Sequence, residues 1–397
     1  MFNIAVAQSG GPTAAINATL AGVIRSAFSK ESEGCITKLY GMRNGIEGFL
    51  AERIVDLSEM FASARGVASE EKLSILCQTP AAALGSCRKK LPKPAEDKAF
   101  FDNLIELFKK YDIRYFFYIG GNDSMDTIRK LSDYAIIKGY PQKFMGVPKT
   151  IDNDLAITDH TPGFGSAAKY IASSILEIAH DTFIYSPKSV TIVEIMGRDA
   201  GWLTASSALA RTKYNKAPHL IYLPEVPFSK EKFIEDVNKK LEEYSNVIIA
   251  VSEGIRDFEG NYIAASMTAT DQFGHQQLSG VGKTLEYLVK EKIGVKVRSV
   301  EVNVLQRCAA HLASKTDLDE SFNQGAYGVK ISLDNVTGSM VCINRKSNEP
   351  YEIEYSHALI ENIANEARSI PVEWIDTENC DIKKELYDYL LPLIQGE

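Results

Sequence analysis

A short segment in the middle of the chain combines the side chains needed to move a phosphoryl group. Pro148-Lys149-Thr150-Ile151-Asp152-Asn153-Asp154 carries a cation, a hydroxyl and two carboxylates, and it follows the strand-like run Phe144–Val147. A carboxylate on such a loop can take a proton from an attacking hydroxyl, and a neighbouring cation can neutralise charge on a transferring phosphoryl group. An ordinary Asn/Asp turn explains the same spacing equally well. The segment alone leaves both interpretations open.

Two glycine-bearing turns follow two other predicted strands. Ile4–Ala7 runs into Gln8-Ser9-Gly10-Gly11-Pro12-Thr13, and Tyr115–Ile119 runs into Gly120-Gly121-Asn122-Asp123-Ser124; a helical segment follows each. This arrangement presents backbone N–H groups to a phosphate, and amide and carboxylate oxygens suit Mg²⁺. A plain tight turn, or a residue that caps the helix, is the simpler alternative. Because ligands bind beyond the carboxyl ends of strands in open α/β sheets, we expect the two turns to face one another across a phosphate site.

The elements that would position these loops alternate along the chain. Short β-branched and aromatic runs alternate with amphipathic segments, which predicts strand-helix-strand units around a parallel sheet. The clear strands are Ile4–Ala7, Tyr115–Ile119, Val190–Ile195, Leu220–Leu223, Val247–Val251 and Ser299–Leu305. The predicted helices are Ile16–Ala27, Ala99–Lys110, Ser166–Ala179, Lys230–Tyr244, Gly282–Ile293 and Ser356–Arg368. Residues 62–98 lack clean periodicity and are expected to form an irregular excursion on the ligand side.

Length and composition limit the classes of protein that fit. A chain of 397 residues suggests two domains, and the pattern breaks near Thr150. With 44 Lys and Arg against 52 Asp and Glu, the net charge has the wrong sign for a general nucleic-acid or membrane surface. No apolar run approaches the ~18 residues of a membrane span, and Met1-Phe2-Asn3 opens on a strand pattern without a basic leader. The cysteines and histidines show no metal-site or redox spacing. We therefore expect a cytoplasmic protein with a local site for an anionic ligand, and no nucleic-acid or membrane partner.

Taken together, the motifs resemble the 6-phosphofructokinase family over about residues 3–315. The resemblance lies in the order and spacing of Gly10-Gly11, Gly120–Ser124, Pro148–Asp154 and a later Met196-Gly197-Arg198. It implies two Rossmann-like three-layer αβα domains with mostly parallel sheets. Residues 1–150, completed by part of 310–397, would bind the phosphoryl donor, and residues 151–309 the sugar phosphate. It also implies Mg²⁺ as cofactor and a homodimer or homotetramer whose subunits share the active site.

The resemblance also implies roles for individual residues. Asp152 would be the base that deprotonates the 1-hydroxyl of fructose 6-phosphate. The other catalytic residues implied are Asp123, Lys149, Thr150 and Arg198. The donor-binding residues are Gly11, Gly121, Asp123, Ser124 and Lys149, with Asn122 at the metal. The sugar-binding residues are Thr150, Asp152, Asp154, Met196, Gly197, Arg198, Glu253, Arg298 and Arg307, of which Arg298 would reach in from a neighbouring subunit.

Two positions bear on the identity of the donor. Members of the family that use ATP resemble one another in having glycine at the positions of Asp123 and Lys149. A carboxylate about 4 Å from the α-phosphate of a nucleotide would cost roughly 4 kcal/mol at an effective dielectric of about 20. Lys149 would instead stabilise phosphate leaving from a shorter donor. These substitutions predict diphosphate as donor and a reversible reaction, which gives phosphate and fructose 1,6-bisphosphate. An ATP-dependent phosphofructokinase and a non-catalytic sugar-phosphate-binding homologue are the alternatives.

Several positions depart from the family pattern. Asn122 replaces an aspartate, and Ser189, beside Lys188, replaces an arginine. Val304 stands where an imidazole or phenol is expected, and Cys308 and Ala309 stand where glycines are expected. Lysine offers a point charge without the bidentate fork of arginine. Weaker sugar-phosphate binding, or another ketose phosphate such as sedoheptulose 7-phosphate, follows as a further alternative.

Overall fold

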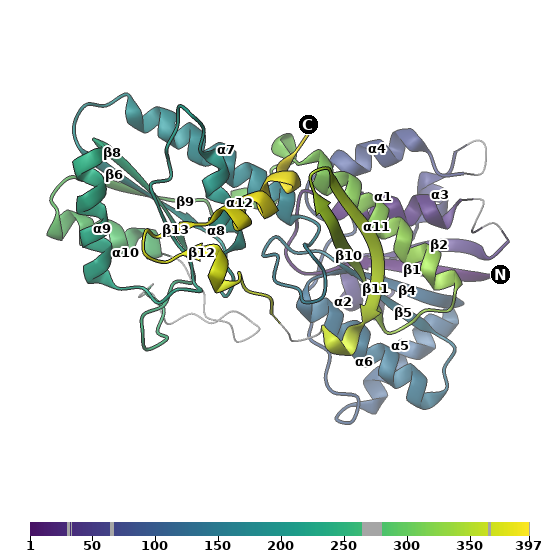
Figure 1. Cartoon of the computed structure of the whole chain (residues 1–397). Helices are drawn as coiled ribbons and strands as arrows, with labels where there is room; N and C mark the ends of the chain where they lie inside the picture. The colour runs from purple at the N-terminus through teal and green to yellow at the C-terminus, as the bar shows by residue number, and fades with distance from the viewer. Residues whose placement is uncertain (30–31, 33, 64–66, 264–279, 364–366, 397) are drawn as a thin grey trace.

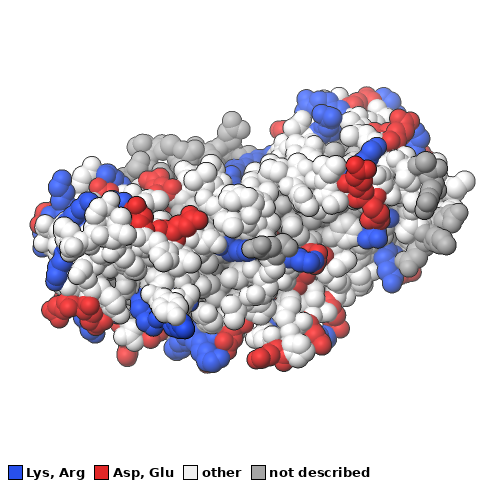
Figure 2. Space-filling model, turned by 90° about the horizontal axis from the view of Figure 1, so that it is seen from above, with Lys and Arg blue, Asp and Glu red and all other residues white. Residues whose placement is uncertain are grey.

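The molecule is built from two lobes, each a β-sheet covered by helices on both faces (Figure 1). The computed structural model describes the whole chain except residues 30–31, 33, 64–66, 264–279, 364–366 and 397. Seen from above, the lobes meet at a waist, and basic and acidic side chains are interspersed over the visible face (Figure 2). None of the helices in the described parts is both long and apolar enough to cross a bilayer.

The first lobe holds a seven-stranded sheet in the order β11-β10-β5-β4-β1-β2-β3. Its strands are β1 (Phe2–Gln8), β2 (Ile36–Met42), β3 (Ile54–Asp56), β4 (Ile113–Gly120), β5 (Lys143–Pro148), β10 (Ser339–Asn348) and β11 (Tyr351–Leu359). The five inner strands run parallel, and only the edge strands β3 and β11 are antiparallel to their neighbours. The expected parallel α/β core is confirmed.

Side-chain alternation in β1 shows how this sheet is covered. Ile4 and Val6 pack against one helical layer, whereas Ala5 and Ala7 pack against the other. The first layer contains α1 (Ile16–Ala27), α3 (Leu57–Phe61), α4 (Glu70–Gln78) and α11 (Lys315–Leu333). The second contains α2 (Gly45–Leu50), α5 (Lys98–Lys110) and α6 (Asn122–Lys138). The lobe is therefore a three-layer αβα unit.

The second lobe repeats this arrangement with a smaller sheet. Its four strands are all parallel and follow the order β7 (Leu220–Tyr222), β8 (Asn246–Ser252), β6 (Ser189–Ile195), β9 (Lys296–Glu301). One face is covered by α7 (Phe164–Phe183), α8 (Trp202–Ser206) and α12 (Lys384–Leu390). The other face is covered by α9 (Lys230–Glu243) and α10 (Val281–Lys292). A short hairpin of β12 (Ile375–Asp376) and β13 (Asp381–Ile382) precedes α12.

Two predicted elements are wrong. The helix expected over Ser356–Arg368 is wrong where the structure describes it: its first residues belong to β11, which pairs antiparallel with β10, and Ile360–Asn362 forms a 3₁₀ turn. Residues 364–366 of that range lie outside the described residues. The predicted strand Ser299–Leu305 ends at Glu301, because Asn303 adopts a left-handed φ of 47° and Asn303–Gln306 turns into a 3₁₀ helix. The excursion 62–98, of which residues 64–66 lie outside the described residues, contains the unpredicted helix α4, which Ser69 caps by accepting a hydrogen bond from the backbone N–H of Lys72. The other predicted strands and helices are confirmed to within a few residues.

Helices α1 and α11 pack unusually closely because glycines stand at their contact. A β-carbon at Gly22 would lie 1.8 Å from the backbone oxygen of Phe322, and one at Gly325 would lie 2.1 Å from that of Thr19. This contact brings α11 against the element that follows the first glycine turn.

We expect Gly325→Ala to destabilise the protein by about 1–3 kcal/mol, the usual cost of overpacking a tight contact. Gly328→Ala on the same helix is the matched control, because its β-carbon would meet only side-chain atoms at ordinary contact distances of 3.4–3.9 Å. Urea denaturation measures both variants. Equal stability of the two would contradict the close-packing argument.

Candidate active site

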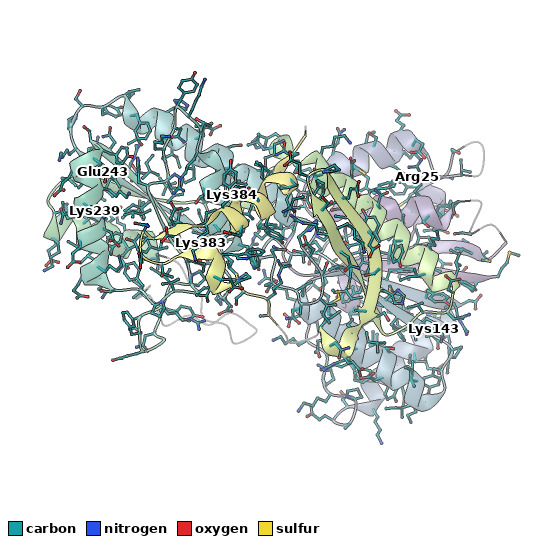
Figure 3. The ribbon with its side chains drawn as sticks, viewed as in Figure 1. Arg25, Lys143, Lys239, Glu243, Lys383 and Lys384 are labelled. Carbon is teal, nitrogen blue, oxygen red and sulfur yellow. The ribbon has the colours of Figure 1, made fainter. Side chains whose placement is uncertain are left out.

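Three loops that were expected to carry chemistry lie side by side at one edge of the first sheet. In the parallel sheet, Gln8 of β1 is paired with Ile119 of β4, and Gly120 is paired with Pro148 of β5. Lys143, at the start of β5, lies at the outer end of the first lobe in Figure 3, so the carboxyl ends of the strands face the second lobe. The predicted juxtaposition of the two glycine turns is confirmed.

The glycine turns are shaped by close approaches. Gly10 has a left-handed φ of 78°, and a β-carbon on Gly11 would meet no atom within 4 Å, so this turn borders open space. A β-carbon at Gly120 would lie 2.0 Å from Ser124 Oγ. Glycine is therefore required for the first turn of α6 to fold against β4. Because Ser124 is only 2% exposed, its side chain supports the turn from beneath, while the N-terminus of α6 offers a site for an anion.

Lys149 bridges the end of β5 and the first glycine turn. It is only 2% exposed, and its ammonium donates a hydrogen bond to the carbonyl oxygen of Gly11. Burial lowers the pKa of Lys149 to about 8; the Asp152 carboxylate opposes this shift, and the charges of Arg307 and Arg88 add to it. Lys149 is thus a cation held in the site with an excess of positive charge around it.

Asp152 and Thr150 lie on the loop of residues 149–154, which we call the aspartate loop. The Asp152 backbone N–H donates to Thr150 Oγ1 at 3.1 Å, and Thr150 Oγ1 lies 3.4 Å from Asp152 Oδ2. Burial raises the pKa of Asp152, while Arg307, Lys149 and Arg198 work in the opposite direction. For Asp154, burial and then the charge of Asp152 raise the pKa to about 7. Asp152 is therefore a carboxylate surrounded by cations.

The Met196-Gly197-Arg198 segment follows β6 in the second lobe and faces the aspartate loop. Gly254 must be glycine, because a β-carbon there would lie 1.8 Å from the backbone oxygen of Arg198. Arg198 Nε is buried without a hydrogen-bond partner among the described residues. A buried unpaired donor is costly unless a ligand satisfies it, so the geometry of Arg198 favours an anionic ligand.

Glu253 joins this segment to the end of β8. Its Oε1 accepts a hydrogen bond from the Gly197 backbone N–H at 3.4 Å. Burial raises the pKa of Glu253 to about 7, with the Gly197 N–H opposing and the Asp152 charge adding to the shift. The mutual influence of Glu253, Asp152 and Arg198 places the residues predicted from both lobes at one site.

Arg298 does not join this cluster within the single chain. Its guanidinium binds Asp181 at 2.6 Å, Thr182 at 2.9 Å and Thr191 at 3.3 Å, on the edge strand β9. Arg307, in contrast, is close enough to lower the pKa values of both Lys149 and Asp152.

Two basic residues of the site, Arg88 and Lys90, were not predicted from the sequence. Their segment is tied to the first glycine turn: Gly10 N donates to the Cys87 carbonyl at 3.2 Å, and Ser86 Oγ donates to the Gly10 carbonyl at 2.6 Å. Arg88 is near enough to Lys149 to lower its pKa. The cluster Arg88-Lys89-Lys90 in an aperiodic stretch was the available signal, and it was overlooked.

Lys90 also changes the interpretation of Asp123. Its ammonium lies 3.4 Å from Asp123 Oδ1, and the two side chains are 48% and 63% exposed. A carboxylate that is paired and largely solvated repels a second anion by much less than the roughly 4 kcal/mol expected at an effective dielectric of about 20.

Residues 3–323 of the sequence match the protein family described as "Phosphofructokinase". The chain belongs to the phosphofructokinase family. The fold agrees: a solved structure from Nitrosospira multiformis, titled as a pyrophosphate-dependent phosphofructokinase, superimposes with a TM-score of 0.87, at 38% identity, over 100% of this chain and 92% of that chain.

Two relatives in the family carry different activity names. A protein of Halomonas elongata named pyrophosphate–fructose 6-phosphate 1-phosphotransferase is 41% identical over 100% of this chain and 92% of its own length. A protein of Alkalicoccus urumqiensis named sulfofructose kinase is 32% identical over 94% of this chain and 92% of its own length.

Proposed function

We propose that this phosphofructokinase transfers a phosphoryl group reversibly from diphosphate to the 1-hydroxyl of fructose 6-phosphate. The observation that carries the proposal is the buried Lys149 ammonium on the Gly11 carbonyl, inside the first glycine turn. With Arg88 and Arg307 nearby, it offers a compact cationic site that matches a small, highly charged donor. The name of the Halomonas relative agrees with this donor and this acceptor.

In this proposal the residues act by positioning and by charge neutralisation, the main sources of catalysis in phosphoryl transfer. Asp152 takes the proton of the attacking hydroxyl, and Thr150 holds the backbone of the aspartate loop at that point. Arg198 and Arg307 bind anionic oxygens of the substrates, and Lys149 stabilises the leaving phosphate. Asp154, Met196, Gly197 and Glu253 shape the pocket of the sugar. Gly11 and Gly121 leave room for the donor.

We also propose Mg²⁺ as the cofactor. The described residues contain no preformed group of three His, Cys, Asp or Glu side chains suited to a metal. Mg²⁺ commonly binds through one or two carboxylates together with the phosphates of its substrate. Asp123 and Asn122, at the first turn of α6 beside the glycine turns, fit such a substrate-borne ion, which would neutralise charge on the donor.

The acceptor is assigned to the second lobe. We propose fructose 6-phosphate, because Arg198, whose Nε has no partner among the described residues, can bind a terminal phosphate, and the name of the Halomonas relative specifies this acceptor. The Alkalicoccus relative is named for a sulfonated sugar, so another ketose with a terminal anion is the second candidate.

A second copy of the chain would complete the sugar site in this proposal. Arg298 lies on β9, an edge strand of the second sheet, and is partly exposed. Val304 and Leu305, which follow that strand, are 58% and 64% exposed. Such an edge with apolar side chains suits a homodimer or homotetramer. Cytoplasmic location stays a prediction.

The donor is tested by initial rates with diphosphate and with ATP, at equal fructose 6-phosphate and Mg²⁺. We expect the rate with diphosphate to exceed that with ATP by at least a hundredfold. In Asp123→Gly/Lys149→Gly, kcat/KM for diphosphate should fall at least a hundredfold and that for ATP should rise. Lys143→Ala is the control, since this lysine begins β5 at the far end of the lobe and its loss leaves the buried cation in place. Equal turnover of both donors by the natural protein would contradict the donor assignment.

The pH dependence tests the role of Lys149. Its pKa of about 8 means that the side chain is a charged ammonium below pH 8 and loses its proton and its charge above pH 8. We expect kcat/KM for diphosphate to decline above pH 8, by up to tenfold per pH unit. In Lys149→Arg the alkaline decline should disappear, because guanidinium stays charged. An unchanged decline in that variant would assign it to another group.

Asp152→Asn tests the base. Because the amide has nearly the same shape and cannot accept the proton, we expect kcat to fall about 10²–10⁴-fold, the usual contribution of a general base. Diphosphate binding, measured by calorimetry, should persist. Asp319→Asn is the matched control, since this exposed carboxylate on α11 pairs with Lys315. Near-normal turnover of Asp152→Asn would remove the base from the mechanism.

A further inference from the structure

The residue between the two carboxylates of the aspartate loop is anchored inside the protein. Asn153 is fully buried and has a left-handed φ of 55°. Its Oδ1 accepts a hydrogen bond from the Thr161 backbone N–H at 3.1 Å, and its Nδ2 donates to the hydroxyl of Tyr389 at 3.0 Å. The direction in which Asp152 and Asp154 point is therefore fixed by contacts of the residue between them.

Tyr389 lies on α12, near the C-terminal end of the chain, and its hydroxyl has no spare capacity. It donates to the carbonyl oxygen of Asp159 at 2.7 Å and accepts from Asn153 Nδ2 and from Arg368 Nη2, each at 3.0 Å. A phenol has one proton and two acceptor positions. The ring packs against Trp202 and Trp374, with centroids 5.3 and 5.7 Å away.

The C-terminal segment that carries Tyr389, here taken as residues 367–396, also contacts the aspartate loop at Asp154 and helix α8 of the second lobe. The Arg368 backbone N–H donates to the Asp154 carbonyl at 2.7 Å, and its guanidinium lies 4.4 Å from the centre of the Trp202 ring. Trp202 begins α8, four residues after Arg198, and its indole N–H donates to the Arg368 carbonyl at 3.1 Å. In Figure 3, Lys383 and Lys384 mark where this segment crosses the second lobe toward the waist.

We propose that Tyr389 is a positioning residue, which aims Asp152 at the acceptor hydroxyl by holding the Asn153 side chain from the C-terminal segment. The inference rests on the proposed role of Asp152 as base. A left-handed non-glycine residue persists only where its surroundings hold it. Without the hydroxyl, the buried Asn153 amide loses its acceptor, and the loop relaxes toward a geometry in which Asp152 points elsewhere. A displacement of about 1 Å at a reacting group can cost about a hundredfold in rate.

Tyr389→Phe is the first test, because it removes only the hydroxyl and keeps the ring in its packing. We expect kcat to fall about 10–100-fold, while KM for diphosphate and for fructose 6-phosphate changes less than about threefold. Tyr355→Phe is the matched control: its hydroxyl lies 3.4 Å from the Glu320 carbonyl and does not contact the aspartate loop. Natural kcat in Tyr389→Phe, or an equal loss in both variants, would overturn the proposal.

A double-mutant cycle separates positioning from a merely structural role. Asn153→Gly retains the positive φ without strain but cannot reach Tyr389. If the two residues act through one hydrogen bond, the double variant should be no slower than the slower single variant, whereas independent effects multiply. Multiplying losses would refute the proposal. Asn153→Gly also tests it without altering the C-terminal segment, and natural kcat in that variant would refute it too.

Asp152→Asn distinguishes the failure of this inference from that of the proposed function. Full activity of Asp152→Asn overturns the base assignment and, with it, the idea that Tyr389 acts through Asp152. An inactive Asp152→Asn beside a fully active Tyr389→Phe overturns the positioning role alone.

Discussion

The site depends on a lysine ammonium that has been removed from water before any substrate arrives. Burying a charge is expensive unless partners compensate, and for Lys149 the Gly11 carbonyl and the Asp152 carboxylate are opposed by the charges of Arg88 and Arg307. The carboxylates do not balance this excess, because burial raises the pKa values of Asp154 and Glu253 to about 7. A site with so little negative charge is stabilised when a polyanion binds. The excess positive charge lowers the stability of the free protein, and the same charge favours the complex with the anion.

Such a site needs a rigid frame, and the frame comes from parts of the chain far from the loops themselves. Asp317 of α11 accepts hydrogen bonds from the backbone N–H groups of Gly163, at 2.8 Å, and Ser166, at 3.0 Å, beyond the aspartate loop. His160 lies between Asp159 and Glu320, at 2.7 and 2.6 Å. Burial lowers its pKa, but the two carboxylates raise it to about 9 overall, so this ion network keeps its charge at neutral pH.

The features predicted from the sequence are those with local causes. β1 and α1 follow from alternation and periodicity within a few residues, and the glycine turns follow from residue types at strand ends. The hydrogen bond between Asn153 and Tyr389 joins residues 236 positions apart, and a local sequence pattern cannot predict such a pair. The end of β11, from Ser356, was mistaken for the start of a helix because none of the residues of this edge strand is fully buried, so its alternation is weak. Arg88 was missed because its segment is shaped by hydrogen bonds to Gly10 rather than by its own periodicity.

Asp123 and Lys149, the two residues that bear on the identity of the donor, differ in burial and therefore in the size of their effect. At about 4 Å, two charges interact by about 1 kcal/mol in bulk water but by about 4 kcal/mol at an effective dielectric of 20. Asp123 is 63% exposed and paired with Lys90, so its repulsion of a nucleotide phosphate lies toward the smaller figure. Lys149 is 2% exposed and occupies volume inside the first glycine turn. Solvent therefore screens its charge only weakly, and the volume of its side chain is excluded to a donor. Preference for a short donor therefore depends mainly on position 149, with Asp123 in a supporting role at the entrance of α6.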